Sequence, residues 1–156
     1  MKKYYVLFAI ATIVLSCSEK AKNDPEVSAT TFIEGTWKLL TGTIIEKGDT
    51  TTTDYTGNKS FIKVINDSHF AFLLHDLSKG KDTSSAAFSA GGGRYTLNGN
   101  NYTEHLEYCS AREWEGHDFS FTITVSGDTL IQNGVEKIEA QGINRINIEK
   151  YIRYKK

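Results

Sequence analysis

The sequence DFSFTITV, residues 118–125, alternates in polarity without a break. Phenylalanine, isoleucine and valine occupy one set of alternate positions, and aspartate, serine and threonine occupy the other. Because successive side chains of a β-strand point to opposite faces, this pattern predicts a strand with one face in a hydrophobic core and the other in solvent. A strand of this kind needs neighbouring strands, and the rest of the sequence supplies them.

Seven further runs of β-branched and aromatic residues lie around this segment, separated by stretches rich in Gly, Asn and Asp. Such runs and turns are typical of an antiparallel meander. Helical periodicity is weak throughout, so we expect at most a short helix, near residues 110–115. The eight predicted strands are residues 35–46, 60–65, 69–75, 87–97, 102–109, 118–125, 129–135 and 144–154.

Glycines indicate how these strands connect and close. Asn98-Gly99 is a strong hairpin signal, and the three glycines at 91–93 predict a bulge or a sharp bend inside a strand. An open sheet would expose the backbone of its first and last strands, and a barrel pairs both. We therefore predict an all-β fold, an eight-stranded up-and-down antiparallel barrel, with a two-sheet β-sandwich as the alternative. A barrel of this size is filled by side chains or holds one small ligand.

The N-terminal residues predict export and lipidation. Lys2 and Lys3 precede a short apolar stretch that ends at Cys17, whereas a membrane-spanning helix needs roughly 20 apolar residues. Residues 14–17, VLSC, resemble the lipobox of bacterial lipoprotein precursors. The resemblance implies cleavage before Cys17 and attachment of acyl chains such as palmitate, several of which form a stable membrane anchor. An ordinary signal peptide is the alternative.

The expected domain organisation follows from this N-terminus. Residues 1–16 form a lipoprotein signal peptide, the polar residues 17–31 form a lipidated flexible tether, and residues 32–156 form the barrel domain. The residue after Cys17 is not the Asp that resembles an inner-membrane retention signal. We therefore expect an outer-membrane lipoprotein of the cell envelope.

Charge and cysteine content narrow the possible partners. The chain has 18 basic and 19 acidic side chains, and without the two lysines of the predicted signal peptide its formal net charge is −3. The remaining Lys and Arg residues are scattered among acids, so we expect no nucleic-acid partner. Lipidation of Cys17 would leave Cys109 alone, which excludes an intramolecular disulfide.

The start of the first predicted strand, Gly35-Thr36-Trp37, resembles the G-x-W opening of lipocalin and calycin barrels. Residues 91–108 and 148–153 are further similar to small lipocalin-like lipoproteins of Bacteroidetes, many of unknown function. The resemblance implies that Trp37 closes the base of the barrel with Arg153 or Arg145 over its ring, a cation–π contact of roughly 0.5 to 2 kcal/mol.

The segment YTEHLEY, residues 102–108, concentrates polar and aromatic groups. Alternation places Glu104 on the more aromatic face, which we expect to point inward, and a buried carboxylate needs a partner such as Arg94 or Arg112. A structural salt bridge is the alternative to a ligand contact. The predicted ligand-binding residues are Tyr95, Tyr102, Glu104, Tyr108, Arg112, Trp114 and Phe121.

Other kinds of chemistry have weaker signals. His105 and Glu107 share one strand face, with His69, His75 and His117 elsewhere, but a zinc site needs three or four ligands at more distinctive spacing. Cys109 and His117 lack the surroundings of a known thiol nucleophile. An acid–base enzyme using Glu104 and His105 would need neighbours on a strand to reach one cavity. We expect no metal, no cofactor and no enzymatic activity.

These observations predict a protein that binds a small hydrophobic or amphipathic molecule in the barrel. The alternative is an envelope protein-interaction module with a filled core, which contacts another envelope protein through the loop at residues 109–117. A cavity of roughly 300 Å³ or more would favour ligand binding.

Overall fold

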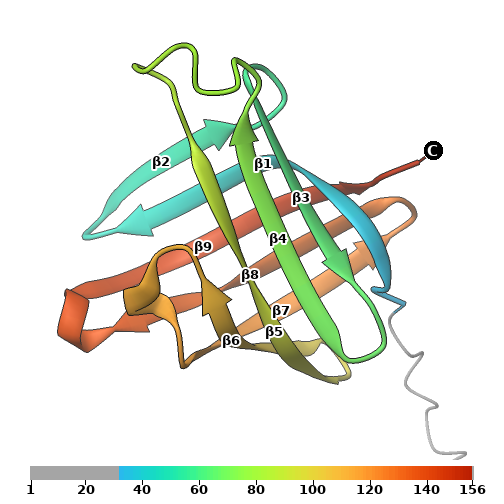
Figure 1. Ribbon diagram of the computed structural model, residues 1–156. Helices are drawn as coiled ribbons and strands as arrows, with labels where there is room; N and C mark the ends of the chain where they lie inside the picture. Colours follow the sequence, from blue (N-terminus) through green and yellow to red (C-terminus); the bar gives the residue numbers. More distant parts are fainter. Residues whose placement is uncertain (1–31, 156) are drawn as a thin grey trace, which may run out of the picture.

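The structure is a computed structural model, and it describes residues 32–155. Within them nine strands form one antiparallel sheet, and two short 3-10 helices lie in its connections (Figure 1). The strands are β1 (Gly35–Glu46), β2 (Asp49–Asp54), β3 (Lys59–Ile65), β4 (His69–Asp76), β5 (Phe88–Asn98), β6 (Asn101–Cys109), β7 (His117–Ser126), β8 (Thr129–Ile138) and β9 (Ile143–Arg153). The helices are η1 (Arg112–Trp114) and η2 (Glu139–Gln141).

The sheet closes into an eight-stranded up-and-down barrel. Strands β3 to β9 pair in sequential order, and β1 completes the cylinder by pairing with β3 on one side and β9 on the other. The pairing of β1 with β9 runs from Trp37 opposite Arg153 to Ile45 opposite Ile146. Closure pairs the backbone groups that an open sheet would expose. The prediction of a barrel is confirmed, and the β-sandwich is excluded.

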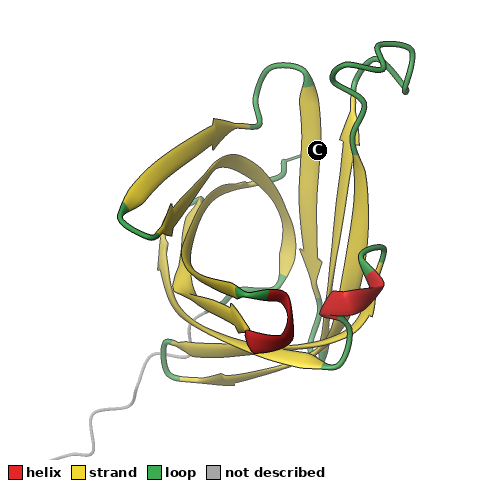
Figure 2. Ribbon diagram, turned by 90° about the vertical axis from the view of Figure 1, so that its left-hand side faces the viewer, coloured by secondary structure: helices red, strands yellow, loops and turns green. Residues whose placement is uncertain are grey.

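Strand β2 is an addition that the sequence did not predict. Its sequence, DTTTTD, has no apolar residue, and five of its six residues are exposed. It pairs with the second half of β1, from Thr41 to Glu46, whereas β3 pairs with only the first four residues of β1. On this side of the barrel, β1 therefore changes partner along its length, from β3 to β2. The β1–β2 hairpin forms one side of the rim (Figure 2).

The three glycines of β5 accompany the bulge that they predicted. The register between β5 and β6 shifts at Gly93, where Glu107 is the extra residue on β6. A Cβ atom on Gly93 would lie 1.9 Å from the carbonyl oxygen of His105, so no larger residue fits here. The extra residue reverses the alternation of β6, and as a result Tyr108 points outward and Cys109 points toward the interior.

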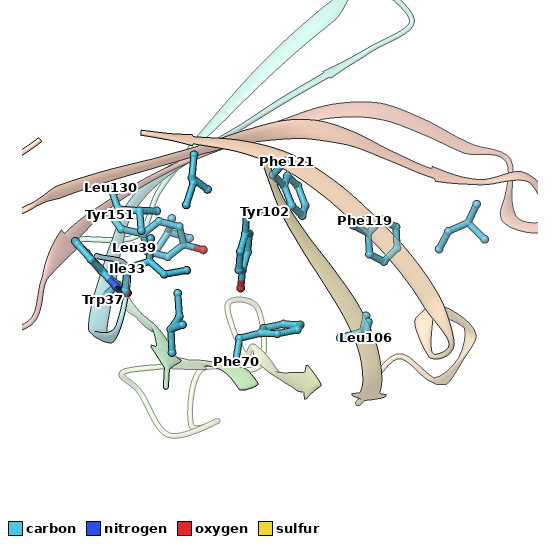
Figure 3. Packing of buried hydrophobic residues seen from close by; sticks show 13 residues of the cluster. Ile33, Trp37, Leu39, Phe70, Tyr102, Leu106, Phe119, Phe121, Leu130 and Tyr151 are labelled. Carbon is cyan, nitrogen blue, oxygen red and sulfur yellow. Dashed lines mark hydrogen bonds between the residues drawn. The ribbon is translucent and has the colours of Figure 1, made fainter. Parts of the chain in front are cut away.

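Apolar side chains fill the end of the barrel that holds the β3–β4, β5–β6 and β7–β8 turns; we call it the closed end (Figure 3). Trp37 is fully buried, and its indole nitrogen donates to the carbonyl oxygen of Ile33 at 2.7 Å. The guanidinium of Arg153 lies 4.1 Å from the centre of the indole ring, as the resemblance implied. The other main side chains of this end are Leu39, Ile65, Phe70, Tyr102, Ile123, Leu130 and Tyr151.

Two smaller points complete the fold. Helix η1 lies inside the range where the sequence allowed a short helix. Across residues 32–155, no helix has the length and apolar content needed to cross a bilayer. The predicted signal peptide, the lipobox at Cys17 and the tether all lie outside the described residues.

Candidate functional site

A cavity of about 350 Å³ occupies the half of the barrel opposite the closed end. Strands from most of the barrel line it, together with β2 and the η1 segment. Much of its wall is aromatic, and the rings of Phe61 and Phe72 stack with their centres 5.9 Å apart. The aromatic residues of the wall are Tyr55, Phe61, Phe72, Trp114, Phe119 and Phe121.

Charged and amide side chains also line this cavity, on the same inward face as the apolar residues of the closed end. On β8, Gln132 and Glu136 alternate with outward residues between the buried Leu130 and Ile138. On β9, Asn147 and Glu149 precede the buried Tyr151 in the same way. The polar lining residues that matter below are Lys63, Glu104, Gln132, Glu136, Arg145, Asn147 and Glu149.

Lys63 forms the centre of the deeper polar cluster. Its side chain is 3 % exposed, and its ammonium donates to Oε1 of Glu104 at 2.6 Å and to Oε1 of Gln132 at 2.9 Å. Oε2 of Glu149 lies 3.8 Å from the same nitrogen. Burial acts to lower the pKa of Lys63, but the carboxylates of Glu104 and Glu149 outweigh it and the pKa is raised. Lys63 therefore stays protonated in the interior.

Glu104 faces inward, but neither predicted arginine is its partner. Arg94 lies on the outer face of β5 and pairs with Glu107 at 2.6 Å. Arg112 belongs to η1, is 82 % exposed and pairs with Glu115 at 2.9 Å. Both expectations were wrong, because alternation directs Arg94 outward and the η1 turn carries Arg112 into solvent. Burial raises the pKa of Glu104, and the neighbouring Lys63 opposes that shift.

A second cluster contains Glu136, whose two carboxylate oxygens both have partners. Oε2 accepts from Nε of Arg145 at 2.7 Å, and Oε1 accepts from the side-chain amide of Asn147 at 2.7 Å. The Arg145 guanidinium lies 5.1 Å from the centre of the Trp114 ring. That ring in turn packs on Phe119, with 5.6 Å between the ring centres. The η1 segment thereby covers part of the cavity with an aromatic and charged layer.

Two polar groups near Lys63 have unused hydrogen-bonding capacity. Glu149 accepts a 2.6 Å hydrogen bond from the hydroxyl of Tyr151 on Oε2, and no residue from 32 to 155 donates to its Oε1. The hydroxyl of Tyr102 is buried close to Glu104, and no hydrogen bond of good geometry joins it to any of residues 32–155. Burial is the first cause that raises the pKa of Tyr102 and of Tyr151, so both phenols are neutral.

The seven predicted ligand-binding residues separate into three groups. Glu104, Trp114 and Phe121 line the cavity. Tyr95 and Tyr102 pack together near the closed end, with ring centres 5.2 Å apart, outside the cavity lining. Tyr108 and Arg112 lie on the outside of the barrel, so the expectation that Tyr108 points inward was wrong. The bulge is the reason, because the extra residue Glu107 turns the side chain of Tyr108 to the outer face of β6.

Most of the polar lining was missed from the sequence. Arg145 was considered only as a partner of Trp37, a place that Arg153 takes. The sequence did contain a signal for these residues. They occupy alternate positions along a strand together with apolar residues that face inward, as Lys63 does between Phe61 and Ile65 on β3. The missed residues are Lys63, Gln132, Glu136, Asn147 and Glu149.

The other candidate chemistries do not come together in one site. His105 lies on the outer face, where its Nδ1 is 2.8 Å from Oδ1 of Asp118, whereas Glu104 faces the interior. Nδ1 of His117 lies 3.2 Å from the backbone oxygen of Glu115. Within residues 32–155, no three His, Cys, Asp or Glu side chains converge as metal ligands.

Comparison of the sequence with protein-family models and with curated proteins finds no match. The topology, an antiparallel barrel of eight strands closed between β1 and β9, is compatible with the lipocalin-like fold that Gly35-Thr36-Trp37 implied.

Proposed function

We propose that the protein is a binding protein, rather than an enzyme, that holds a small amphipathic molecule in the barrel. The observation that carries this proposal is the cavity of about 350 Å³. Ligand sites in proteins have volumes of roughly 300 to 1,000 Å³, with mostly apolar walls and a few placed polar groups. Aromatic rings and a small set of inward charges give this cavity that composition.

The polar groups support an amphipathic ligand over a purely apolar one. Burying Lys63 and Glu104 costs free energy, and an all-apolar barrel would avoid that cost. Lys63 is 3 % exposed and still keeps its charge among carboxylates. A molecule with one polar end and an apolar body would contact these groups and the aromatic wall together.

Occlusion of the cavity tests the proposal. Ala111 lines the cavity next to η1, so Ala111→Trp should fill its mouth. We expect the full chain to bind the neutral fluorescent probe N-phenyl-1-naphthylamine. The substitution should abolish binding of the probe inside the cavity. The matched control is Ala140→Trp, at an exposed position on η2 outside the cavity lining. Equal binding by both variants would contradict a ligand site in the barrel.

The interaction-module alternative loses support from the same geometry. It required a filled core, and the cavity is open space. It also required the loop at residues 109–117 as a contact surface, but Trp114 is half-buried there against Phe119 and Arg145. The loop is thus engaged with the barrel.

We also propose that the chain is an outer-membrane lipoprotein anchored through Cys17. The support is the sequence of residues 1–17 alone. In bacteria grown with radiolabelled palmitate, the wild-type chain should incorporate label and sediment with the outer membrane. Cys17→Ser should do neither, and Cys109→Ser serves as the control. Label in the Cys17→Ser chain would refute the assignment of this residue.

A further inference from the structure

The cavity has an excess of negative charge. Three carboxylates and two cations line it, which gives a formal charge of −1. Each cation is closely paired with one carboxylate, Lys63 with Glu104 at 2.6 Å and Arg145 with Glu136 at 2.7 Å. The remaining carboxylate, Glu149, has Lys63 only at 3.8 Å. A ligand that enters the cavity therefore meets one carboxylate without a close cationic partner.

The hydrogen bonds of Glu149 leave it able to accept more. Tyr151 donates to Oε2 at 2.6 Å, and Oε1 has no donor among residues 32–155. The side chain is 15 % exposed and lines the cavity, so Oε1 is open to a ligand that enters it. A positively charged ligand group would satisfy both the charge and the remaining hydrogen-bonding capacity of this carboxylate.

Aromatic rings surround this carboxylate. Gly42 lies opposite Glu149 in the β1–β9 pairing, and a Cβ atom on Gly42 would be 3.3 Å from the Tyr55 ring. Tyr55 and Glu149 both line the cavity, and Glu149 raises the pKa of Tyr55, second to burial. The ring of Phe61 packs on Tyr55 at 5.8 Å and on Tyr151 at 6.4 Å. Aromatic faces beside a carboxylate are a favourable environment for an organic cation.

We propose that the ligand is an amphipathic organic cation whose ammonium group pairs with Glu149 and whose apolar body contacts the rings of Tyr55, Phe61 and Phe72. This inference rests on the proposed function, because it assigns a chemical class to the ligand of the same cavity. An anionic amphiphile would enter a cavity that already has a formal charge of −1 and would add a negative charge near Glu149.

A matched series of probes tests the inference. The compounds 4-phenylbutylammonium, 4-phenylbutan-1-ol and 4-phenylbutanoate share one apolar body and differ in the charge of the head group. Calorimetric titration of the full chain at neutral pH should show the ammonium compound binding at least about tenfold more tightly than the other two. Glu149→Gln, which keeps the shape of the side chain, should reduce that preference to about twofold or less.

The control variant is Glu139→Gln, which removes an exposed carboxylate outside the cavity and should keep the full preference. The preference among the three probes is read on the wild-type chain, so it does not depend on the folding of any variant. Equal or tighter binding of 4-phenylbutanoate would overturn the inference, as would a preference that survives Glu149→Gln. If the wild-type chain gives either of these results but still binds N-phenyl-1-naphthylamine, only the charge class of the ligand is wrong. If it does not bind N-phenyl-1-naphthylamine either, the proposed function is contradicted as well.

Discussion

The two halves of the barrel are built on the same strands and the same inward positions, but they hold different side chains. Around Trp37 the interior is closely packed and apolar, with the guanidinium of Arg153 over the indole ring. Around Lys63 the interior contains ionised groups, amides and a cavity of about 350 Å³. The contrast shows that alternation determines which residues face inward, whereas the type of each residue decides whether that interior is a core or a site.

The two halves should therefore contribute differently to stability and binding. Packed apolar side chains release free energy on burial, whereas buried ion pairs give little net stability because desolvation offsets their attraction. We expect substitutions in the closed end to change the free energy of unfolding, and substitutions of the aromatic residues of the cavity wall to change ligand affinity more than stability.

The largest effect is expected at Trp37. Trp37→Ala removes a fully buried indole together with its bond to Ile33 and its contact with Arg153. Deletions of this size cost about 3 to 5 kcal/mol. Urea unfolding followed by circular dichroism measures the change. Phe61→Ala, in the cavity wall, is the matching substitution in the other half of the barrel, and we expect it to cost less. An equal loss in the free energy of unfolding would contradict the expected difference between the two halves.

A loss of about 3 kcal/mol is expected for Lys63→Met, because Glu104 is left buried without a cation. The double variant Lys63→Met with Glu104→Leu should recover most of that loss, since it removes both charges. Urea unfolding of the wild type, of Lys63→Met, of Glu104→Leu and of the double variant forms a double-mutant cycle. If the double variant were less stable than either single one, the polar cluster would be a source of stability and not a feature retained for binding.

The bulge is expected to tolerate little change. Gly93→Ala places a methyl group against the backbone of β6, and the required shift should cost about 1 to 3 kcal/mol. The same substitution at Gly57, where nothing lies within 4 Å of the added atom, is the control. Thermal unfolding of the two variants compares them. Equal melting temperatures would show that the strand can shift its register freely at this point.

A smaller, pH-dependent effect is expected at Asp76, at the rim. The hydroxyl of Ser78 lies 2.5 Å from its carboxylate, and this bond, followed by the backbone amides of Gly80 and Ala87, lowers the pKa of Asp76. A lowered native pKa adds stability above the unfolded pKa of about 3.9, and that stability is lost as the pH falls below it.

Asp76→Asn should therefore reduce stability at neutral pH and flatten the loss of stability between about pH 4 and pH 2. Melting temperatures of the wild type and the variant across this range measure both changes. Parallel curves for the two chains would exclude a contribution of Asp76 to the acid sensitivity of the fold.

Much of the fold could be predicted because local signals agreed. The alternation at residues 118–125 and the turn at Asn98-Gly99 located strands whose bounds in the structure differ by at most one residue at each end. Strand β2 could not be found in this way, because its stability comes from pairing with β1 and its own side chains are mostly exposed. Pairing of this kind leaves no apolar pattern in the sequence.

The candidate site was harder to predict than the fold. Its charged and amide residues come from four strands, and their meeting depends on the closure of the barrel. The pairing of Lys63 with Glu104 joins residues 41 positions apart, and no local spacing indicates it. The glycines of β5 predicted a bulge, but they did not identify Glu107 as the extra residue on the neighbouring strand. Because the extra residue was not identified, the sequence placed Tyr108 on the inner face of the strand instead of the outer face.

The same reversal of phase gives Cys109 an unusual position. Its side chain lines the cavity, and it is the only cysteine among the described residues. A reporter coupled to this sulfur would sit inside the barrel wall, next to whatever occupies the interior, without any engineered attachment point. An environment-sensitive dye placed there would convert entry of a guest molecule into an optical signal.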